Sequence, residues 1–444
     1  MDLNEARGLV ERKLREKGVP AWEIYAQTSD VFSVEVKQGE VDSLKAARGQ
    51  GLSVRTLREG RLGFAYSTSL EEGALAGMVE SAVAGGEAVE ADPLVAFAEP
   101  KPFPELDLVD GRLAETPRER KIAGAREMEK ACLGFHPAIK RARTAAYRET
   151  AREVTIRNSL GLDASYKSTG TSASIVAVAE GAEGARTGWD FDFGRGFSDL
   201  DFEGVGLRAA EKARSLLGAR KVKTVRCPVV LDHSAATELL DVLASSFLAS
   251  NVQRGKSMLA GRVGEGVMSE AVTIVDDGLL DGGAATAPFD DEGAPTERTA
   301  LVEAGKLSGF LYDLYTARKD GRASTGNASR AGIKGPPDVG TTNLFILPGE
   351  RPMPELVKTA GRGVLLTEFL GIHTADPISG DFSVGAQGFW IEGGEIAYPV
   401  GGVAVAGNIL RMFAGVVEAG SDLRMFGSSG APSLLVRELS ISGD

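Results

Sequence analysis

WEIYAQTSDVFSVEVKQGEVDSLKAARGQGLSVRTLREGRLGFAY, residues 22–66, is the stretch that decides the fold class. Short runs in which apolar and polar side chains alternate are separated in it by glycines. This pattern is typical of strands joined by tight turns, so the segment predicts an antiparallel meander. The alternating runs are Trp22–Thr28, Phe32–Val36, Val41–Leu44, Leu52–Leu57 and Leu62–Tyr66.

Helices are predicted on both sides of this meander. Residues 3–17 carry apolar side chains at helical spacing, and Lys17-Gly18 ends the run as a C-terminal stop signal. After the meander, Ser69-Leu70-Glu71-Glu72 matches a capping box that opens a helix to about Ala84. A meander between two helices indicates an α+β fold.

The same arrangement returns in the next hundred residues. Thr116-Pro117-Arg118-Glu119 matches a second capping box and predicts a helix to about Leu133. Alternating text from Lys140 to Trp189 and a helical pattern over 200–217 follow. We therefore predict an N-terminal α+β domain, residues 1–220, made of two meander-plus-helix parts at about 1–110 and 111–220.

The second half of the chain has a different character. Beyond Lys221-Val222-Lys223, which we take as the joint between domains, the text is rich in glycine and in short strands. Only 235–248 and 354–368 look helical. Strand signals such as 389–391, 397–400 and 434–436 predict a mostly-β C-terminal domain, residues 221–444, with a barrel or sandwich core.

Charge and composition exclude several classes of function. The formal net charge is −12 and no Lys/Arg run is present, so direct nucleic-acid binding is not expected. The first residues are acidic, and no apolar run is long enough for a membrane span, which predicts a soluble cytoplasmic protein without membrane contact. The two cysteines, Cys132 and Cys227, are far apart and are expected to be buried, reduced thiols.

Motif searches name no reaction. The histidines are His136, His233 and His373, and no two of them have the spacing of a helical metal-binding pair, so no metal is expected in this chain. His136 is expected in a turn and His233 in a capping or packing role. Residues 204–209 match a dinucleotide fingerprint, but acidic residues precede them, so we interpret them as the turn into a helix.

Carboxylates form the densest polar group in the chain. Asp276-Asp277 and Asp281 are followed by Asp290-Asp291-Glu292 in a glycine-rich stretch. Such crowding could bind a hard cation or supply an acid/base pair. The same residues could equally be loop carboxylates that cap turns.

Several short stretches in a fixed order resemble the TldD/PmbA family. They are Val34-Glu35-Val36-Lys37, Gly51-Leu52-Ser53-Val54-Arg55, Gly60-Arg61-Leu62-Gly63-Phe64-Ala65, Asp276-Asp277, Phe289-Asp290-Asp291-Glu292-Gly293, Thr316-Ala317-Arg318, Ser324-Thr325-Gly326-Asn327 and Gly380-Asp381-Phe382-Ser383-Val384-Gly385. Together they span nearly the whole chain.

TldD-type members carry H-E-x-x-x-H on a helix of the second domain, and a C-terminal cysteine completes their zinc site. The matching helix here has Asp241, Val242 and Ser246 at the His, Glu and His positions. The C-terminal stretch 426–432 has serines and no cysteine. The chain thus resembles the PmbA/TldE branch, which lacks the zinc motif, and no catalytic residue is assigned to it.

The resemblance implies a role beside another chain. PmbA/TldE-type members pair with a TldD-type H-E-x-x-x-H chain in a protease that matures peptides and degrades small unfolded proteins. Zinc is then expected in the partner, with no cofactor in this chain. Asp290, Asp291, Glu292 and Asn327 are the candidates for lining the substrate chamber. The family description "modulator of DNA gyrase" is not read as DNA contact, because the chain is acidic.

Two other hypotheses stay open. The chain could be an independent hydrolase that uses the carboxylates of residues 276–292. It could also be a homodimeric peptide-binding module with no protease partner.

Overall fold

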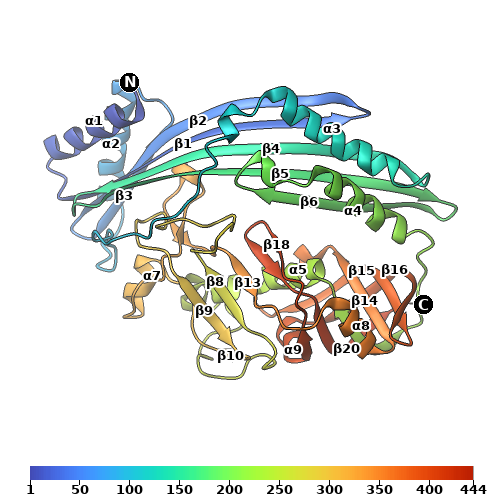
Figure 1. Cartoon of the computed structure of the whole chain (residues 1–444). Coiled ribbons are helices and arrows are strands. Elements are labelled where there is room, and N and C mark those ends of the chain that lie inside the picture. Colours follow the sequence, from blue (N-terminus) through green and yellow to red (C-terminus); the bar gives the residue numbers. More distant parts are fainter. Residues whose placement is uncertain (444) are drawn as a thin grey trace.

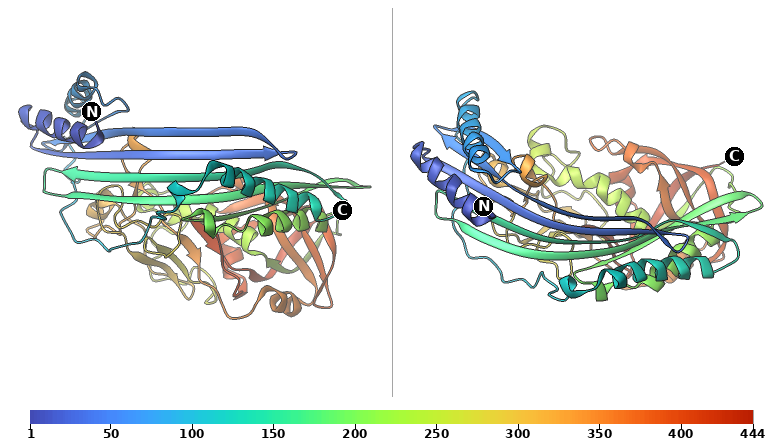
Figure 2. Two further views of the ribbon diagram at one scale, coloured as in Figure 1. Left: turned by 45° about the horizontal axis from the view of Figure 1, so that its top comes forward. Right: turned by 90° about the horizontal axis from the view of Figure 1, so that it is seen from above.

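The computed structural model describes residues 1–443, and its largest element is a six-stranded antiparallel sheet of long, curved strands (Figures 1 and 2). The strand order is β3-β2-β1-β4-β5-β6, so the pairing of β1 with β4 joins the two predicted meanders into one sheet. The strands are β1 (Ala21–Lys37), β2 (Glu40–Arg58), β3 (Arg61–Ser67), β4 (Ile139–Asn158), β5 (Asp163–Gly181) and β6 (Gly184–Gly194).

The meander of residues 22–66 is confirmed, but its division into five short strands is wrong. The first two predicted runs are parts of β1, and the third and fourth are parts of β2. Polar segments such as Lys45–Gln50 continue the ladder because strand pairing uses backbone groups, which every residue supplies.

The four helices predicted in this half are confirmed. Helices α1 and α2 pack at one end of the sheet, and α3 and α4 lie side by side on the same sheet towards its other end (Figure 1). They are α1 (Leu3–Glu16), α2 (Glu72–Glu87), α3 (Arg118–Gly134) and α4 (Phe202–Ser215). As expected, Gly18 follows α1 with a positive φ of 61°.

Both predicted capping boxes are wrong. Helix α2 is preceded by Glu71 and α3 by Pro117, and neither residue makes a side-chain cap bond. The Ser69 hydroxyl accepts from the Glu71 amide two residues on, and the Thr116 hydroxyl donates to the Arg112 carbonyl. A capping box occurs instead at the start of α1, between Asp2 and Glu5.

A closed five-stranded barrel forms the core of the C-terminal half. The order is β16-β15-β14-β7-β20, and pairing of β16 with β20 closes it, while β17 extends β20. The predicted barrel-like core is confirmed. The strands are β7 (Val225–Leu231), β14 (Gly363–Leu370), β15 (Asp381–Glu392), β16 (Glu395–Asn408), β17 (Val416–Ala419) and β20 (Leu434–Ser442).

A second six-stranded sheet lies between this barrel and α7, in the order β10-β9-β8-β13-β19-β18 (Figure 1). Two further short strands, β11 and β12, pair with each other. These strands are β8 (Ile274–Asp277), β9 (Arg298–Glu303), β10 (Lys306–Leu307), β11 (Ala328–Ser329), β12 (Asp338–Val339), β13 (Leu344–Ile346), β18 (Arg424–Phe426) and β19 (Ser429–Ala431).

The helices of this half differ from the prediction. The predicted helix over 354–368 ends at Ala360, because Gly361 takes a positive φ and β14 starts at Gly363. Three short helices were not predicted. The helices are α5 (His233–Ala244), α6 (Ala249–Gln253), α7 (Leu314–Lys319), α8 (Met353–Ala360) and α9 (Ile409–Ala414).

The N-terminal sheet lies across the C-terminal half, and a mixed apolar cluster joins them. Tyr25, Val154 and Ile156 of the sheet pack there with Phe289 of the second half. The division at residue 220 stays a prediction. Cys132 and Cys227 are buried and free, and no helix in residues 1–443 has both the length and the apolarity to cross a bilayer.

Gly206, in the fingerprint-like segment, serves helix packing. A Cβ at this position would lie 2.3 Å from the Met128 carbonyl oxygen of α3. The start of the same segment is a helix turn in which the Asp201 side chain accepts from the Gly204 amide at 2.9 Å. Close approach of α3 and α4 therefore explains why glycine is required at 206.

We predict that Gly206→Ala lowers the free energy of unfolding by about 1–3 kcal/mol, because the methyl group meets backbone atoms. Gly77→Ala in α2 is the matched control, since no atom lies within 4 Å of its added Cβ. It should leave stability unchanged or raise it by up to about 1 kcal/mol. Urea unfolding followed by circular dichroism measures both; equal effects would contradict the packing role.

Candidate functional site

A chain of buried charges crosses from the N-terminal sheet to the C-terminal half. Glu23 on β1 and Arg55 on β2 are direct cross-strand neighbours. The Arg55 guanidinium donates from Nε to Glu23 Oε1 at 2.9 Å and from Nη2 to Oε2 at 2.6 Å. Neither side chain is exposed by more than 5%. This bidentate pair is the centre of the junction.

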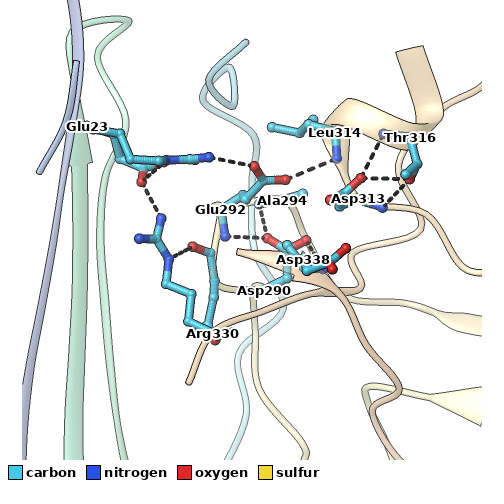
Figure 3. Close-up of polar contacts among 12 residues, drawn as sticks. Glu23, Asp290, Glu292, Ala294, Asp313, Leu314, Thr316, Arg330 and Asp338 are labelled. Atoms are coloured by element: carbon cyan, nitrogen blue, oxygen red, sulfur yellow. Dashed lines mark hydrogen bonds and ion pairs between the residues drawn. The ribbon is translucent and has the colours of Figure 1, made fainter. Parts of the chain in front are cut away.

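Two residues of the second half complete the chain of charges (Figure 3). Arg55 Nη1 donates to Glu292 Oε1 at 2.9 Å, and the fully buried Arg330 donates to Glu23. The Arg330 guanidinium also lies 4.6 Å from the centre of the Tyr25 ring. Glu292, Arg55, Glu23 and Arg330 thus alternate in sign, so two carboxylates and two guanidinium groups neutralise one another.

The pKa values follow from this arrangement. Burial acts to raise the pKa of Glu23, but Arg55 and Arg330 outweigh it and the net shift is downward. Burial also acts to lower the pKa of Arg55, and the Glu23 and Glu292 carboxylates raise it instead. Burial raises the pKa of Glu292, although the Arg55 charge and the Leu314 amide oppose the rise. The charged forms of Glu23 and Arg55 are therefore the ones that this arrangement favours.

The candidate chamber residues Asp290 and Asp291 have structural partners. Asp290 is buried and accepts from the backbone amides of Glu292 and Ala294 at 2.9 Å and of Ala328 at 3.0 Å. Burial and then the Glu292 charge raise its pKa, while these amide bonds oppose the rise. Asp291 accepts from the Tyr25 hydroxyl at 3.0 Å and the Arg330 amide at 2.8 Å.

Asn327 and the carboxylates of residues 276–281 bind one another or other parts of the fold. Asn327 donates to buried Asp276 at 2.7 Å and to the Gly340 carbonyl. Burial raises the pKa of Asp276. Asp277 caps a turn by accepting from the Leu279 amide, and exposed Asp281 pairs with Arg195 at 2.5 Å. The carboxylates of 276–292 are therefore distributed over several local networks.

Three of the four chamber candidates border one cavity. Asp290, Asp291 and Asn327 line a cavity of about 240 Å³ together with Arg152 and Tyr166 of the N-terminal sheet. Glu292 instead lines a separate cavity of about 580 Å³ beside Asp313 and Arg55. Contact of these residues with a substrate stays a prediction. Within residues 1–443, no group of three or more His, Cys, Asp or Glu side chains is arranged to hold a metal ion.

The positions compared above with a zinc-protease motif lie apart from the carboxylate network, on and after α5. Asp241 is exposed, Val242 is half-buried, and Ser246 is buried in the short turn that follows α5. Helix α5 packs against β19, which brings Ser429 of the C-terminal stretch beside the Asp241 side chain. The two segments compared with the family's zinc site are thus neighbours in space.

The histidines lie outside the carboxylate network. His136 accepts from the Ala138 amide within a turn, as expected. His233 is the first residue of α5, where Asp232 supplies the cap, and its ring lies 5.7 Å from that of Phe426.

A second polar contact joins the two halves. Asp190 on β6 is buried and accepts from Arg424 of β18 at 2.7 Å and from Lys212 of α4 at 2.7 Å. Burial acts to raise the pKa of Asp190, but the hydrogen bonds and charges of Arg424 and Lys212 lower it to about 2. Asp190 therefore stays ionised to a lower pH than an ordinary aspartate.

Sequence reasoning missed the residues that hold the junction. Glu23 stands among Trp22, Ile24 and Tyr25, and Arg55 follows Leu52 and Val54. A charged residue inside an apolar strand is the available signal, because such a charge is retained only with a partner. The two partners of Glu23 lie 32 and 307 positions away in the sequence, so spacing along the chain could not identify them.

Sequence profiles of one family match nearly all of the chain. They are described as PmbA/TldA metallopeptidase domain 1, central domain and C-terminal domain, and they match residues 22–85, 111–217 and 224–443. Metalloprotease PmbA of Escherichia coli O157:H7 is 30% identical over 426 residues, 95% of this chain and 92% of the relative. The chain belongs to the PmbA/TldD metallopeptidase family.

Solved structures of PmbA/TldD-like proteins share the whole fold. A protein of Thermotoga maritima described as a candidate modulator of a DNA gyrase is 31% identical, with a TM-score of 0.92 over 99% of this chain and 100% of that one. TldE of Thermococcus kodakarensis is 25% identical, with a TM-score of 0.90 over 98% and 99%. The predicted resemblance to the family is confirmed.

We predict that Glu23→Gln lowers the free energy of unfolding by about 3–5 kcal/mol, because buried Arg330 loses the carboxylate it pairs with and Arg55 keeps only Glu292. Glu35→Gln on the same strand is the matched control; none of the residues 1–443 forms an ion pair with Glu35. Its effect should stay within about 0.5 kcal/mol. Urea unfolding measures both, and a small effect of Glu23→Gln would contradict the role of the charge chain.

The Asp190 contact predicts a pH dependence of stability. Its folded pKa lies below its unfolded value, so the unfolded chain binds more protons between about pH 4 and 2. The stabilisation, about 2 kcal/mol, is fully present above pH 4 and is lost as the pH falls through about 2. Asp190→Asn should be less stable than the wild type at pH 6, with the difference shrinking in acid. A pH-independent difference in urea unfolding would contradict this.

Proposed function

We propose that this chain is a non-catalytic, cytoplasmic PmbA/TldE-like subunit of a TldD-type metallopeptidase complex. Its partner would be an H-E-x-x-x-H chain that holds the zinc, and the complex would act on peptides and small unfolded proteins. This chain would help to enclose the chamber in which the partner cuts.

The observation that carries the proposal is the side-chain chemistry around α5. Zinc in a peptidase needs about three protein ligands, and a base must activate the attacking water. The corresponding positions here hold Asp241, Val242 and Ser246, and the neighbouring stretch offers Ser429 in place of a cysteine. A single carboxylate among hydroxyl groups does not make such a site.

The carboxylates of 276–292 give less support to an independent hydrolase. Asp290 is engaged by three backbone amides, and Glu292 by Arg55 and the Leu314 amide. A general base needs a free lone pair directed at its substrate. Hydrogen bonds to the fold occupy those groups, which favours a structural role.

The direct test is a tagged pull-down from the native organism, with mass spectrometry of bound chains and zinc quantified per chain. We expect an H-E-x-x-x-H protein in stoichiometric amount carrying all of the zinc. Recovery of this chain alone as a dimer would favour the peptide-binding module, and zinc bound to this chain would overturn the proposal.

Substitutions among the carboxylates of residues 276–292 distinguish the independent hydrolase from the proposed non-catalytic subunit. We predict that the purified chain does not cleave unfolded casein, and that Asp291→Asn leaves the peptidase activity of the reconstituted complex within about twofold, because Asp291 bonds to Tyr25 and Arg330. Cleavage by the chain alone that is abolished by Asp290→Asn or Asp291→Asn, with unchanged circular dichroism, would instead establish the independent hydrolase.

A further inference from the structure

A continuous groove runs between one face of the N-terminal sheet and a glycine-rich loop of the C-terminal half. It consists of two cavities of about 450 and 240 Å³ that share Arg152, Ser168, Ala284 and Thr286 as lining residues. The loop Gly282–Thr286 forms one wall. Strands β4, β5 and β6 form the other.

The sheet wall is built from successive cross-strand pairs. Arg148, Thr150 and Arg152 alternate along β4 and therefore project from the same face. Their partners on β5 are Ser172, Gly170 and Ser168. Gly170, between the two serines, has no side chain, so the middle of this wall projects less into the groove.

Arginines give the groove a positive charge in an otherwise acidic chain, whose formal net charge is −12. Arg148 is exposed and forms no ion pair with any of the residues 1–443. Arg152 binds Tyr25 through Nη2, and its buried Nε has no hydrogen-bond partner within the described chain. Arg195, at the same groove, pairs with exposed Asp281.

The acidic residues at the smaller cavity do not cancel this charge for a ligand near Arg148. Asp290 is buried and bonded to three backbone amides, and Asp291 is bonded to Tyr25 and Arg330. Arg152 lies 3.9 Å from Asp291, where the two cavities meet. Arg148 lies four residues away on β4 and lines only the larger cavity.

The spacing of the arginines selects an extended ligand. Four residues of strand separate Arg148 from Arg152 by about 14 Å, which is too far for one carboxylate but equals the distance between residues i and i+4 of an extended peptide. Beside Arg148 and Ser172, Phe193 continues the row and stacks on Phe191, with ring centres 6.1 Å apart. These rings offer an apolar wall to a neighbouring side chain.

We propose that this groove binds an extended acidic peptide segment, whose carboxylates pair with Arg148 and Arg152 while an apolar side chain lies on Phe191 and Phe193. The inference rests on the proposed function in that the ligand is a peptide, and it adds a preference for acidic sequence. The peptide would be recognised by side chains on the face of the sheet. A guanidinium group suits this role because it can donate two parallel hydrogen bonds to one carboxylate.

Fluorescence anisotropy with the purified chain tests the proposal. The probe is a fluorescein-labelled peptide with two Glu residues four positions apart in a Thr/Phe background. One comparison peptide replaces Glu with Lys, and another places the two Glu residues three apart, on opposite sides of an extended chain. We expect the first probe to bind at least about fivefold more tightly than either, and more weakly as salt rises. Equal binding of the three peptides would overturn the proposal.

Substitutions locate the binding site. Arg148→Glu should weaken binding of the acidic probe at least about fivefold, because it reverses a charge at the groove. Arg143→Glu is the matched control: this exposed arginine lies on the same strand and outside the lining of either cavity. Equal effects of the two substitutions would show non-specific attraction and overturn the site, with circular dichroism confirming that both variants fold.

Because the chain is assayed alone, this result does not depend on the zinc-bearing partner. The pull-down described above, repeated with Arg148→Glu, reports the partner separately. Loss of peptide binding with the partner retained would support the groove. Retention of peptide binding by Arg148→Glu would overturn it, whatever partner is recovered.

Discussion

The buried chain of charges from Glu292 through Arg55 and Glu23 to Arg330 is the interaction on which the relative placement of the two halves depends. A buried ion pair adds little net stability compared with an apolar replacement, but an incomplete one is strongly unfavourable. Glu23 and Arg55 of the first half pair with each other, whereas Glu292 and Arg330 of the second half pair with residues of the first half. The network therefore favours one docked arrangement over slipped alternatives, while the apolar cluster around Tyr25 and Phe289 supplies the burial.

The long N-terminal sheet extends beyond this junction and forms one wall of the groove. Its strands run well beyond the apolar junction, so the same β4 that packs Val154 and Ile156 against the second half presents Arg148 and Arg152 towards the glycine-rich loop. The groove exists because the sheet is held at one end by the junction and at the other by the Asp190–Arg424 contact. Function would thus reside between the halves, with neither half forming the groove alone.

The PmbA/TldD fold is present here around an α5 region with Asp, Val and Ser at positions 241, 242 and 246. Helix α5 packs beside β19, and Asp241 and Ser429 are neighbours. These residues fit the non-catalytic role proposed above. The engaged carboxylates of 276–292 fit the same interpretation, since they tie loops together.

The sequence by itself determined the fold class and the helices of the first half, because periodicity and residue chemistry are local properties. It did not determine the length of β1 and β2 or the end of α8, since backbone pairing and a glycine turn override apolar patterns there. Only the tertiary structure decided that Glu23 meets Arg330, that Glu292 and Asn327 line separate cavities, and that three arginines line one groove. Such contacts join residues hundreds of positions apart, and their partners are chosen by the docking of surfaces, which no local spacing encodes.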